Sequence, residues 1–185
     1  MNRAKKEALK HPEKHAPPEL NIVFRDTPEK FRPMADEILP PLIGLLRSLC
    51  ALEEEMHARD IKLRASRPGG IYSTEMHPDT PALWQEYKDR YHALLDPHCT
   101  ARFLAGRRDC CQCMGDPADF SGLNRGGTVE FTMKSPAKAV VMVAESKSGS
   151  VDCRFDLRPE GGAWKIDKAA YRFLNDPKWH TEHYM

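Results

Sequence analysis

The sequence lacks any apolar stretch long enough to cross a bilayer, which takes about 20 consecutive apolar residues. Its longest apolar run, residues 38–46, is interrupted by Pro40, Pro41 and Gly44. The N-terminal residues 1–15 are basic, but the apolar stretch that a Sec-type signal peptide requires does not follow them. We therefore expect no membrane association and a cytoplasmic location.

An excess of charge of one sign is also missing. The 185 residues include 28 Lys and Arg against 27 Asp and Glu, which gives a formal net charge of +1. Proteins that attract nucleic acid through their overall field are strongly basic, so a nucleic-acid partner is not expected. The 41% of hydrophobic residues are enough to form a core, and this composition argues against general disorder.

Cysteine is sparse for a disulfide scaffold, because six residues are spread over the whole chain. Small secreted scaffolds carry denser cysteine and a signal peptide, so we expect free thiols. Cys110, Cys111 and Cys113 form a cluster, and thiolates are good zinc ligands. Their spacing, however, lacks the two separated C-x-x-C pairs of a zinc site. We expect no metal and no cofactor, although zinc binding or redox sensing by these three thiols stays open.

Helical patterns occupy the first two thirds of the chain. A first helix is predicted from Pro28, which suits a first helical turn, to the pair Pro40 and Pro41, which should end it. A second helix, 41–64, shows an apolar stripe at three-and-four spacing. A third helix is predicted from 80 to 95, followed by a short helix at 98–105 and a loop at 106–126.

The last third alternates apolar and polar residues, as strands that are buried on one face do. Strands are predicted at 128–134, 139–144, 151–158 and 164–173, with a bulge near Asp167 or Lys168 where the alternation changes phase. Short connections predict antiparallel neighbours. The fold class is therefore α+β, with N-terminal helices packed on a curved antiparallel sheet. The expected organisation is a flexible basic tail 1–25, a single domain 26–175 and a C-terminal tail 176–185.

Two stretches resemble a known family. The first is Asp-Phe-Ser-Gly-Leu-Asn at 119–124, directly before the strand at 128–134. The second is Glu-Gly-Gly-Ala-Trp-Lys-Ile-Asp at 160–167, followed by Tyr171 and Arg172. Together they resemble the bacterial immunity proteins of the nuclear-transport-factor-like cone fold, over roughly residues 80–175. The resemblance implies an antitoxin that neutralises a cognate protein toxin by direct stoichiometric binding, without catalytic residues. A homodimer stays open.

Three features are candidates for partner binding. The acidic run Glu53, Glu54 and Glu55 would suit a basic partner, or else forms a solvated helix face. Tyr72 lies in an apolar loop that builds an interface or folds back as a lid. Trp179 near the C-terminus is an aromatic anchor for a partner or a second subunit, or part of a frayed tail.

The main alternative is a small-molecule-binding or enzymatic cone domain of the isomerase or dehydratase kind. Tyr87, Tyr91, His92 and Asp156 are conceivable lining residues. Both tyrosines lie on an apolar stripe, which favours core packing, and Asp156 is expected to be solvated. Because no base is paired with an orienting group, we expect no enzyme activity. A third alternative is an assembly module that dimerises through the outer face of the sheet.

Overall fold

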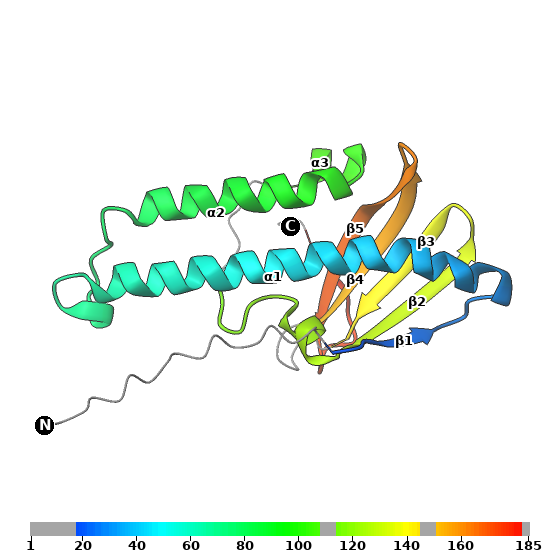
Figure 1. Ribbon diagram of the computed structural model, residues 1–185, viewed down its shortest axis with the longest axis horizontal. Coiled ribbons are helices and arrows are strands. Elements are labelled where there is room, and N and C mark those ends of the chain that lie inside the picture. Colours follow the sequence, from blue (N-terminus) through cyan, green and yellow to red (C-terminus); the bar gives the residue numbers. More distant parts are fainter. Residues whose placement is uncertain (1–17, 108–113, 145–150, 183–185) are drawn as a thin grey trace, which may run out of the picture.

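The computed structural model describes residues 18–107, 114–144 and 151–182. A long helix α1 (Ala35–Ala65) and a shorter helix α2 (Thr80–Leu95) pack against a curved, unclosed sheet of six strands (Figure 1). The remaining named elements are α3 (Ala101–Gly106), β1 (Asn21–Phe24), β2 (Thr128–Ser135), β3 (Lys138–Val143), β4 (Val151–Glu160), β5 (Ala163–Phe173) and β6 (His180–Glu182). The predicted α+β class is confirmed. No helix in the described ranges has both the length and the apolar character needed to span a bilayer.

The six strands lie in the sheet in their chain order. Each successive pair of strands from β2 to β6 is antiparallel, whereas β1 runs parallel to β2. The predicted antiparallel meander is therefore confirmed. Parallel strands need a long connection between them. The chain between β1 and β2 contains α1, α2 and α3, so this requirement is met.

The sheet continues beyond the expected domain boundaries at 26 and 175. Strand β1 lies in the segment 1–25 that the sequence suggests is a tail, and its residues pair with 128–131 of β2. Strand β6 lies in the expected C-terminal tail and pairs with 169–171 of β5. Residues 1–17 are outside the described part of the chain. Strands of four and three residues are too short to show an alternation in the sequence.

Helix α1 runs without interruption through Pro40 and Pro41, so the prediction that they end a helix is wrong. Only residues 29–34 before it form a separate 3-10 helix. Each proline removes one backbone donor, which would have bonded the carbonyl four residues earlier, at Asp36 or Glu37. All four residues are exposed. Water can therefore satisfy the freed carbonyls, and the helix continues.

The N-terminal part of α1 crosses one face of the sheet, and its C-terminal part extends past the sheet alongside α2 (Figure 1). Ile38, Leu46 and Leu49 of α1 are fully buried and belong to the same core as Phe131 and Phe155 of the sheet. Beyond the sheet, the buried side chains of α1 pack on those of α2. The helices thus form a hairpin that starts on the sheet and ends away from it.

Strand β5 contains the bulge that the sequence predicts. Asp156 of β4 lies opposite Lys168, whereas the next residue, Leu157, lies opposite Ile166, so Asp167 is an extra residue on β5. The phase of the alternation changes there, and the side chain of Asp167 is buried. Trp164, expected in the core, is only partly buried and packs against the core from its margin.

Candidate docking surface at the helical hairpin

The loop that joins α1 to α2, residues 66–79, displays three large apolar side chains to solvent. We call this loop the hairpin tip. Ile71, Tyr72 and Met76 are 52%, 89% and 67% exposed, respectively. The Arg67 side chain ties the loop together by donating hydrogen bonds to the carbonyls of Ile71, at 3.3 Å, and Glu75. The loop therefore holds its apolar side chains outward on a backbone that is internally bonded.

A hollow of about 370 Å³ lies between the two helices, next to the tip. Its apolar wall is formed by Leu63, Ala82 and Leu83, and its charged residues come in both signs. The complete lining is Arg59, Lys62, Leu63, Asp79, Ala82, Leu83 and Glu86. An apolar floor with charged groups at its margin is the usual composition of a docking site.

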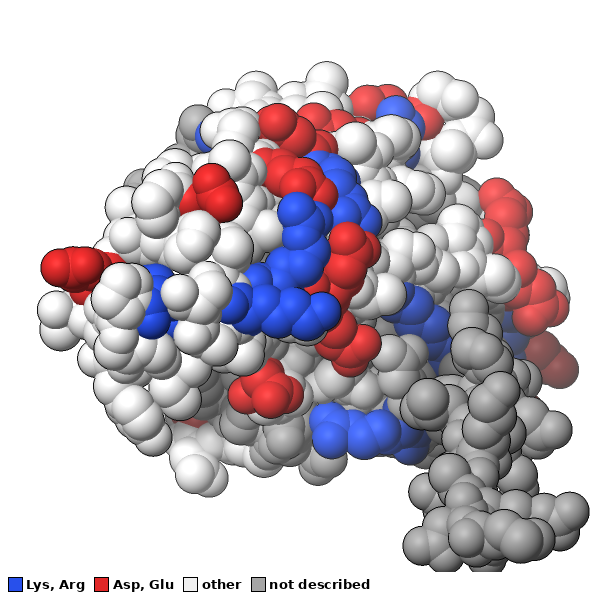
Figure 2. Space-filling view, turned by 60° about the vertical axis from the view of Figure 1, so that its left-hand side comes forward, with Lys and Arg blue, Asp and Glu red and all other residues white. Residues whose placement is uncertain are grey.

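Four side chains link the two helices below the tip in a closed network. Arg59 of α1 bonds both carboxylate oxygens of Glu86 at 2.5 and 2.7 Å, and Arg90 of α2 bonds both oxygens of Glu55 at 2.7 Å. Within each helix, the pairs Glu55–Arg59 and Glu86–Arg90 close the ring. Figure 2 shows Lys and Arg side chains interleaved with Asp and Glu side chains along one band on this side of the molecule.

The arginines keep both glutamates of this network charged. A hydrogen bond from Arg90 lowers the pKa of Glu55, and one from Arg59 lowers the pKa of Glu86, in each case against a smaller effect of desolvation. Two positive and two negative charges cancel within the ring. The network fixes the position of α2 along α1 and adds no net charge to the surface. One sequence signal could have indicated this network. It is the four-residue spacing of Glu and Arg, which occurs at Glu55 and Arg59 and again at Glu86 and Arg90.

The three glutamates predicted as an acidic patch have three different environments. Glu53 is only 3% exposed, and its carboxylate accepts hydrogen bonds from the backbone amides of Gly115, at 2.7 Å, and Asp119, at 2.9 Å. Glu55 belongs to the arginine network, and Glu54 is exposed. Successive helical residues point about 100° apart, so a run of three cannot share one face. The three glutamates therefore do not form one acidic patch, and partner binding by Glu54 and Glu55 stays a prediction.

The other two candidate residues lie far from each other. Tyr72 is at the free end of the hairpin, whereas Trp179 directly precedes β6 at the edge of the sheet. Trp179 is half-buried, and the guanidinium of Arg172 lies 4.8 Å from its ring centroid. The structure thus does not bring the candidate partner residues into one surface. Trp179 packs on the sheet, and Tyr72 projects from the tip.

The residues proposed for an enzymatic pocket are mainly structural. Tyr87 and Tyr91 are buried on α2 with ring centroids 5.8 Å apart, which confirms core packing. Burial, and then the nearby charges of Tyr87, Asp119, Glu182 and Glu53, raise the pKa of Tyr91. Its phenol therefore stays protonated at neutral pH. His92 is half-buried on the same helix.

Asp156 was expected to be solvated, and that prediction is wrong because its side chain is buried. Lys138 lies 2.7 Å and Arg154 2.9 Å from its carboxylate oxygens. Burial alone would raise the pKa of Asp156, but the hydrogen bonds and charges of these two cations outweigh it and lower the pKa. Asp156 is thus a structural ion-pair partner on the outer face of the sheet.

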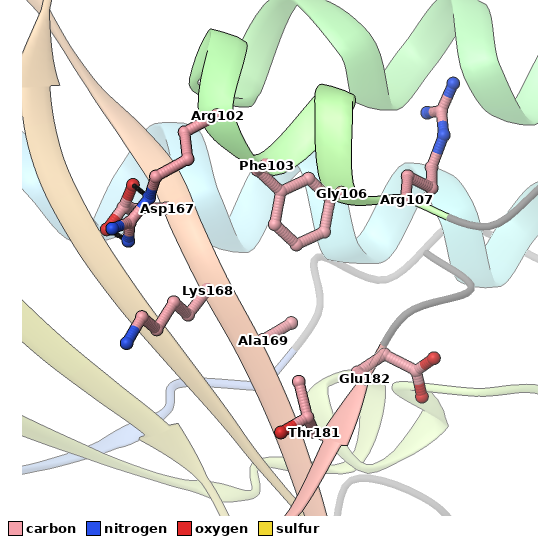
Figure 3. A pocket seen from close by; sticks show the side chains of 9 residues that line it. All are labelled: Arg102, Phe103, Gly106, Arg107, Asp167, Lys168, Ala169, Thr181 and Glu182. Atoms are coloured by element: carbon pink, nitrogen blue, oxygen red, sulfur yellow. Dashed lines mark hydrogen bonds and ion pairs between the residues drawn. The ribbon is translucent and has the colours of Figure 1, made fainter.

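A second hollow, of about 170 Å³, lies between α3 and strands β5 and β6 (Figure 3). Phe103 and Ala169 face each other across it. Arg102 bonds Asp167, and Arg107 bonds Asp96 at 2.5 Å, so both guanidinium groups already have carboxylate partners. The hollow therefore offers mainly apolar contact to a ligand.

Two of the described cysteines, Cys50 and Cys99, are free thiols of low reactivity. Cys50 and Cys99 are buried, and burial is the main cause that raises the pKa of each thiol to about 12. Cys153 is half-buried. In the described ranges no three His, Cys, Asp or Glu side chains are grouped so that they could hold a metal ion. The cluster Cys110, Cys111 and Cys113 lies outside the described residues.

A scan against protein-family models, a search of curated proteins and a search of solved structures each found no match for this chain. The resemblance to immunity proteins therefore stays a prediction.

Proposed function

We propose that this protein is an immunity protein, an antitoxin that neutralises a cognate protein toxin by stoichiometric binding, and that the hairpin tip with its adjoining hollow is the docking surface. The resemblance supplies the class of partner. The observation that carries the choice of surface is the exposure of Tyr72 together with Ile71 and Met76 on one internally bonded loop. Clusters of exposed apolar side chains within a polar surround mark protein-binding sites.

The tip has the physical properties of an interface core. Tyrosine is enriched among the residues that dominate binding energy, because it buries a large apolar area and has few rotatable bonds to order. The bonds from Arg67 order the loop before a partner arrives, which reduces the entropy lost on binding. A rigid loop and a large aromatic side chain together favour tight binding at this place.

The hollow suits an apolar side chain from the toxin. An apolar side chain of the toxin would enter between Leu63 and Leu83, while Tyr72 fills an apolar depression on the toxin. Charged toxin groups would contact Lys62 and Asp79 at the margin, where they affect specificity more than affinity. Binding of this kind blocks the toxin by covering it and needs no catalytic group on this chain.

The test begins with capture of the partner from the native host. The captured protein is then expressed alone in a susceptible bacterium, where it must arrest growth, and co-expression of this chain must restore growth. The binding variant is Tyr72→Ser with Met76→Ser. Its matched control is Phe173→Ser with Leu174→Ser, because this pair is also apolar and about half exposed but lies at the sheet.

We expect the tip variant to bind the toxin at least about 30-fold more weakly, as the loss of an interface anchor implies. It should lose protection while it keeps the melting temperature of the parent chain. The control should bind within about threefold. Failure to find a toxic partner, or full protection by the tip variant, would contradict the proposal.

A further inference from the structure

The face of the sheet turned away from α1 carries a concentration of cations. On β4 the inward positions are Cys153, Phe155 and Leu157, so the intervening residues point outward. The outward cations of β3, β4 and β5, with one residue from α3 beside them, form what we call the basic face. Its members are Arg102, Lys138, Arg154, Arg158, Lys165, Lys168 and Arg172.

The carboxylates of this region lie beneath the cations. Asp152, Asp156 and Asp167 are all buried, although they are on the solvent side of the sheet. Arg172 bonds Asp152 at 2.8 Å, and Asp156 has two cationic partners. The long stems of Lys and Arg cover the aspartates and bring the positive groups to the surface.

Asp167 at the bulge shows the same arrangement. Arg102 and Arg158, the latter at 3.1 Å, both bond its buried carboxylate, while their own side chains remain 59% and 54% exposed. The hydroxyl of Thr100 donates a further hydrogen bond at 3.2 Å. One carboxylate thus holds two guanidinium groups in place. The group as a whole keeps a positive charge that is fixed in position.

The basic face therefore has a net positive charge although the whole chain is nearly neutral. Seven cations stand against Asp152, Asp156, Asp167 and Glu160, the last of which is exposed at the end of β4. Among the described residues, no acidic side chain forms an ion pair with Lys165 or Lys168. Figure 3 shows the amino group of Lys168 directed away from Phe103 and the interior.

We propose that the basic face binds a carboxylate-rich polypeptide segment of a partner protein. Alternate residues of an extended peptide lie about 6.8 Å apart, and neighbouring strands about 4.8 Å apart. Acidic residues at every second position of an extended segment lie on one side of it, so they can face the cations together. Charge complementarity is the force that would bring it there.

The composition of the face favours an acidic polypeptide over a nucleic acid. Single-stranded nucleic acid is held by aromatic side chains on which its bases stack. The outward residues of β5 along this face are Lys165, Lys168, Ala170 and Arg172, and none is aromatic. The ring of Trp179 is already covered by the guanidinium of Arg172. This surface is separate from the hairpin tip, so its binding does not depend on the toxin proposal.

The experiment measures fluorescence anisotropy of a labelled peptide of about 16 residues in which Glu alternates with Thr. An oligothymidylate of equal charge is the competing probe. The variant is Lys165→Glu with Lys168→Glu, which leaves the ion pairs to the three aspartates intact. The matched control is Lys30→Glu with Arg32→Glu, which changes the net charge equally on exposed side chains of the 3-10 helix before α1, away from this face. If the Glu variant does not fold, Lys165→Gln with Lys168→Gln replaces it.

We expect the parent chain to bind the peptide at low ionic strength, with an affinity that falls as salt is added. The basic-face variant should bind at least about tenfold more weakly, and the control within about twofold. Absence of binding by the parent chain would overturn the proposal, as would equal weakening in both variants. Equal or tighter binding of the oligothymidylate would assign the face to nucleic acid instead and would also overturn it.

Discussion

The carboxylate of Glu53 accepts a hydrogen bond of 2.9 Å from the backbone amide of Asp119, a residue 66 positions away in the sequence. Its other oxygen accepts a 2.7 Å hydrogen bond from the amide of Gly115. A single buried side chain of α1 thereby fixes both ends of the segment 115–119 that leads toward the sheet. These bonds satisfy backbone donors that no strand or helix partner satisfies.

We expect Glu53→Ala to lower the free energy of unfolding by about 2–3 kcal/mol, because two amides lose a charged acceptor. Glu54→Ala is the control, since Glu54 is exposed on the same turn of the same helix, and its effect should stay within about 0.5 kcal/mol. Urea denaturation followed by circular dichroism measures both. Equal effects of the two substitutions would contradict the structural role of Glu53.

Trp164 and Phe155 should differ in their contribution to stability because they differ in burial. Phe155 is in the centre of the core, and Phe155→Ala should cost about 3–5 kcal/mol. Trp164 is only partly buried, so we expect Trp164→Ala to cost about 1–3 kcal/mol. Thermal unfolding of the two variants shows which substitution lowers the stability more. A larger loss for Trp164 would place it inside the core, where the sequence alone suggests it lies.

Stability should fall in acid, in part through Asp156. Because its pKa in the folded state is lowered, its ion pairs contribute stability above the unfolded pKa near 4, and this contribution is lost as the pH falls through the folded pKa. Asp156→Asn should therefore be less stable than the parent chain by about 2 kcal/mol at pH 7. The difference should shrink below pH 4, as urea titrations at several pH values would show. A difference that is constant with pH would indicate that the charge of Asp156 is unimportant.

The buried thiols should resist alkylation. With pKa values of about 12, Cys50 and Cys99 are almost wholly protonated at pH 8, and the thiolate is the reactive form. Iodoacetamide should modify them roughly a thousandfold more slowly in the folded chain than in urea. Mass spectrometry of the digested protein resolves each site, and half-buried Cys153 should react before them. Rapid labelling of Cys50 in the folded chain would contradict its burial.

The meander and the bulge were predictable because each depends on a local pattern. Alternation along 128–134 and 151–158 identifies the strands, and the change of phase around Asp167 identifies the extra residue. Pro40 and Pro41 misled the prediction, because the effect of a proline depends on whether its freed carbonyl meets water. That depends on which face of α1 packs on the sheet, and this is a tertiary property.

The candidate site was only partly predictable. The exposed apolar loop around Tyr72 was identified from its composition, whereas the acidic run was misjudged because Glu53 points into the fold. The basic face was missed entirely. The net charge of +1 gives no sign of the basic face. Its aspartates are buried and its lysines and arginines reach the surface only in the folded sheet.

The two short outer strands, β1 and β6, affect how the chain can meet its own copies. The long strands β4 and β5 lie inside the sheet, and only strands of four and three residues are at its edges. A short edge offers few free backbone groups to a strand of another molecule, which discourages edge-to-edge aggregation. A chain shortened to begin at residue 26 would lose β1 and expose the backbone of β2 along 128–131. Strand β1 therefore covers a longer strand edge that could otherwise pair with another copy of the chain.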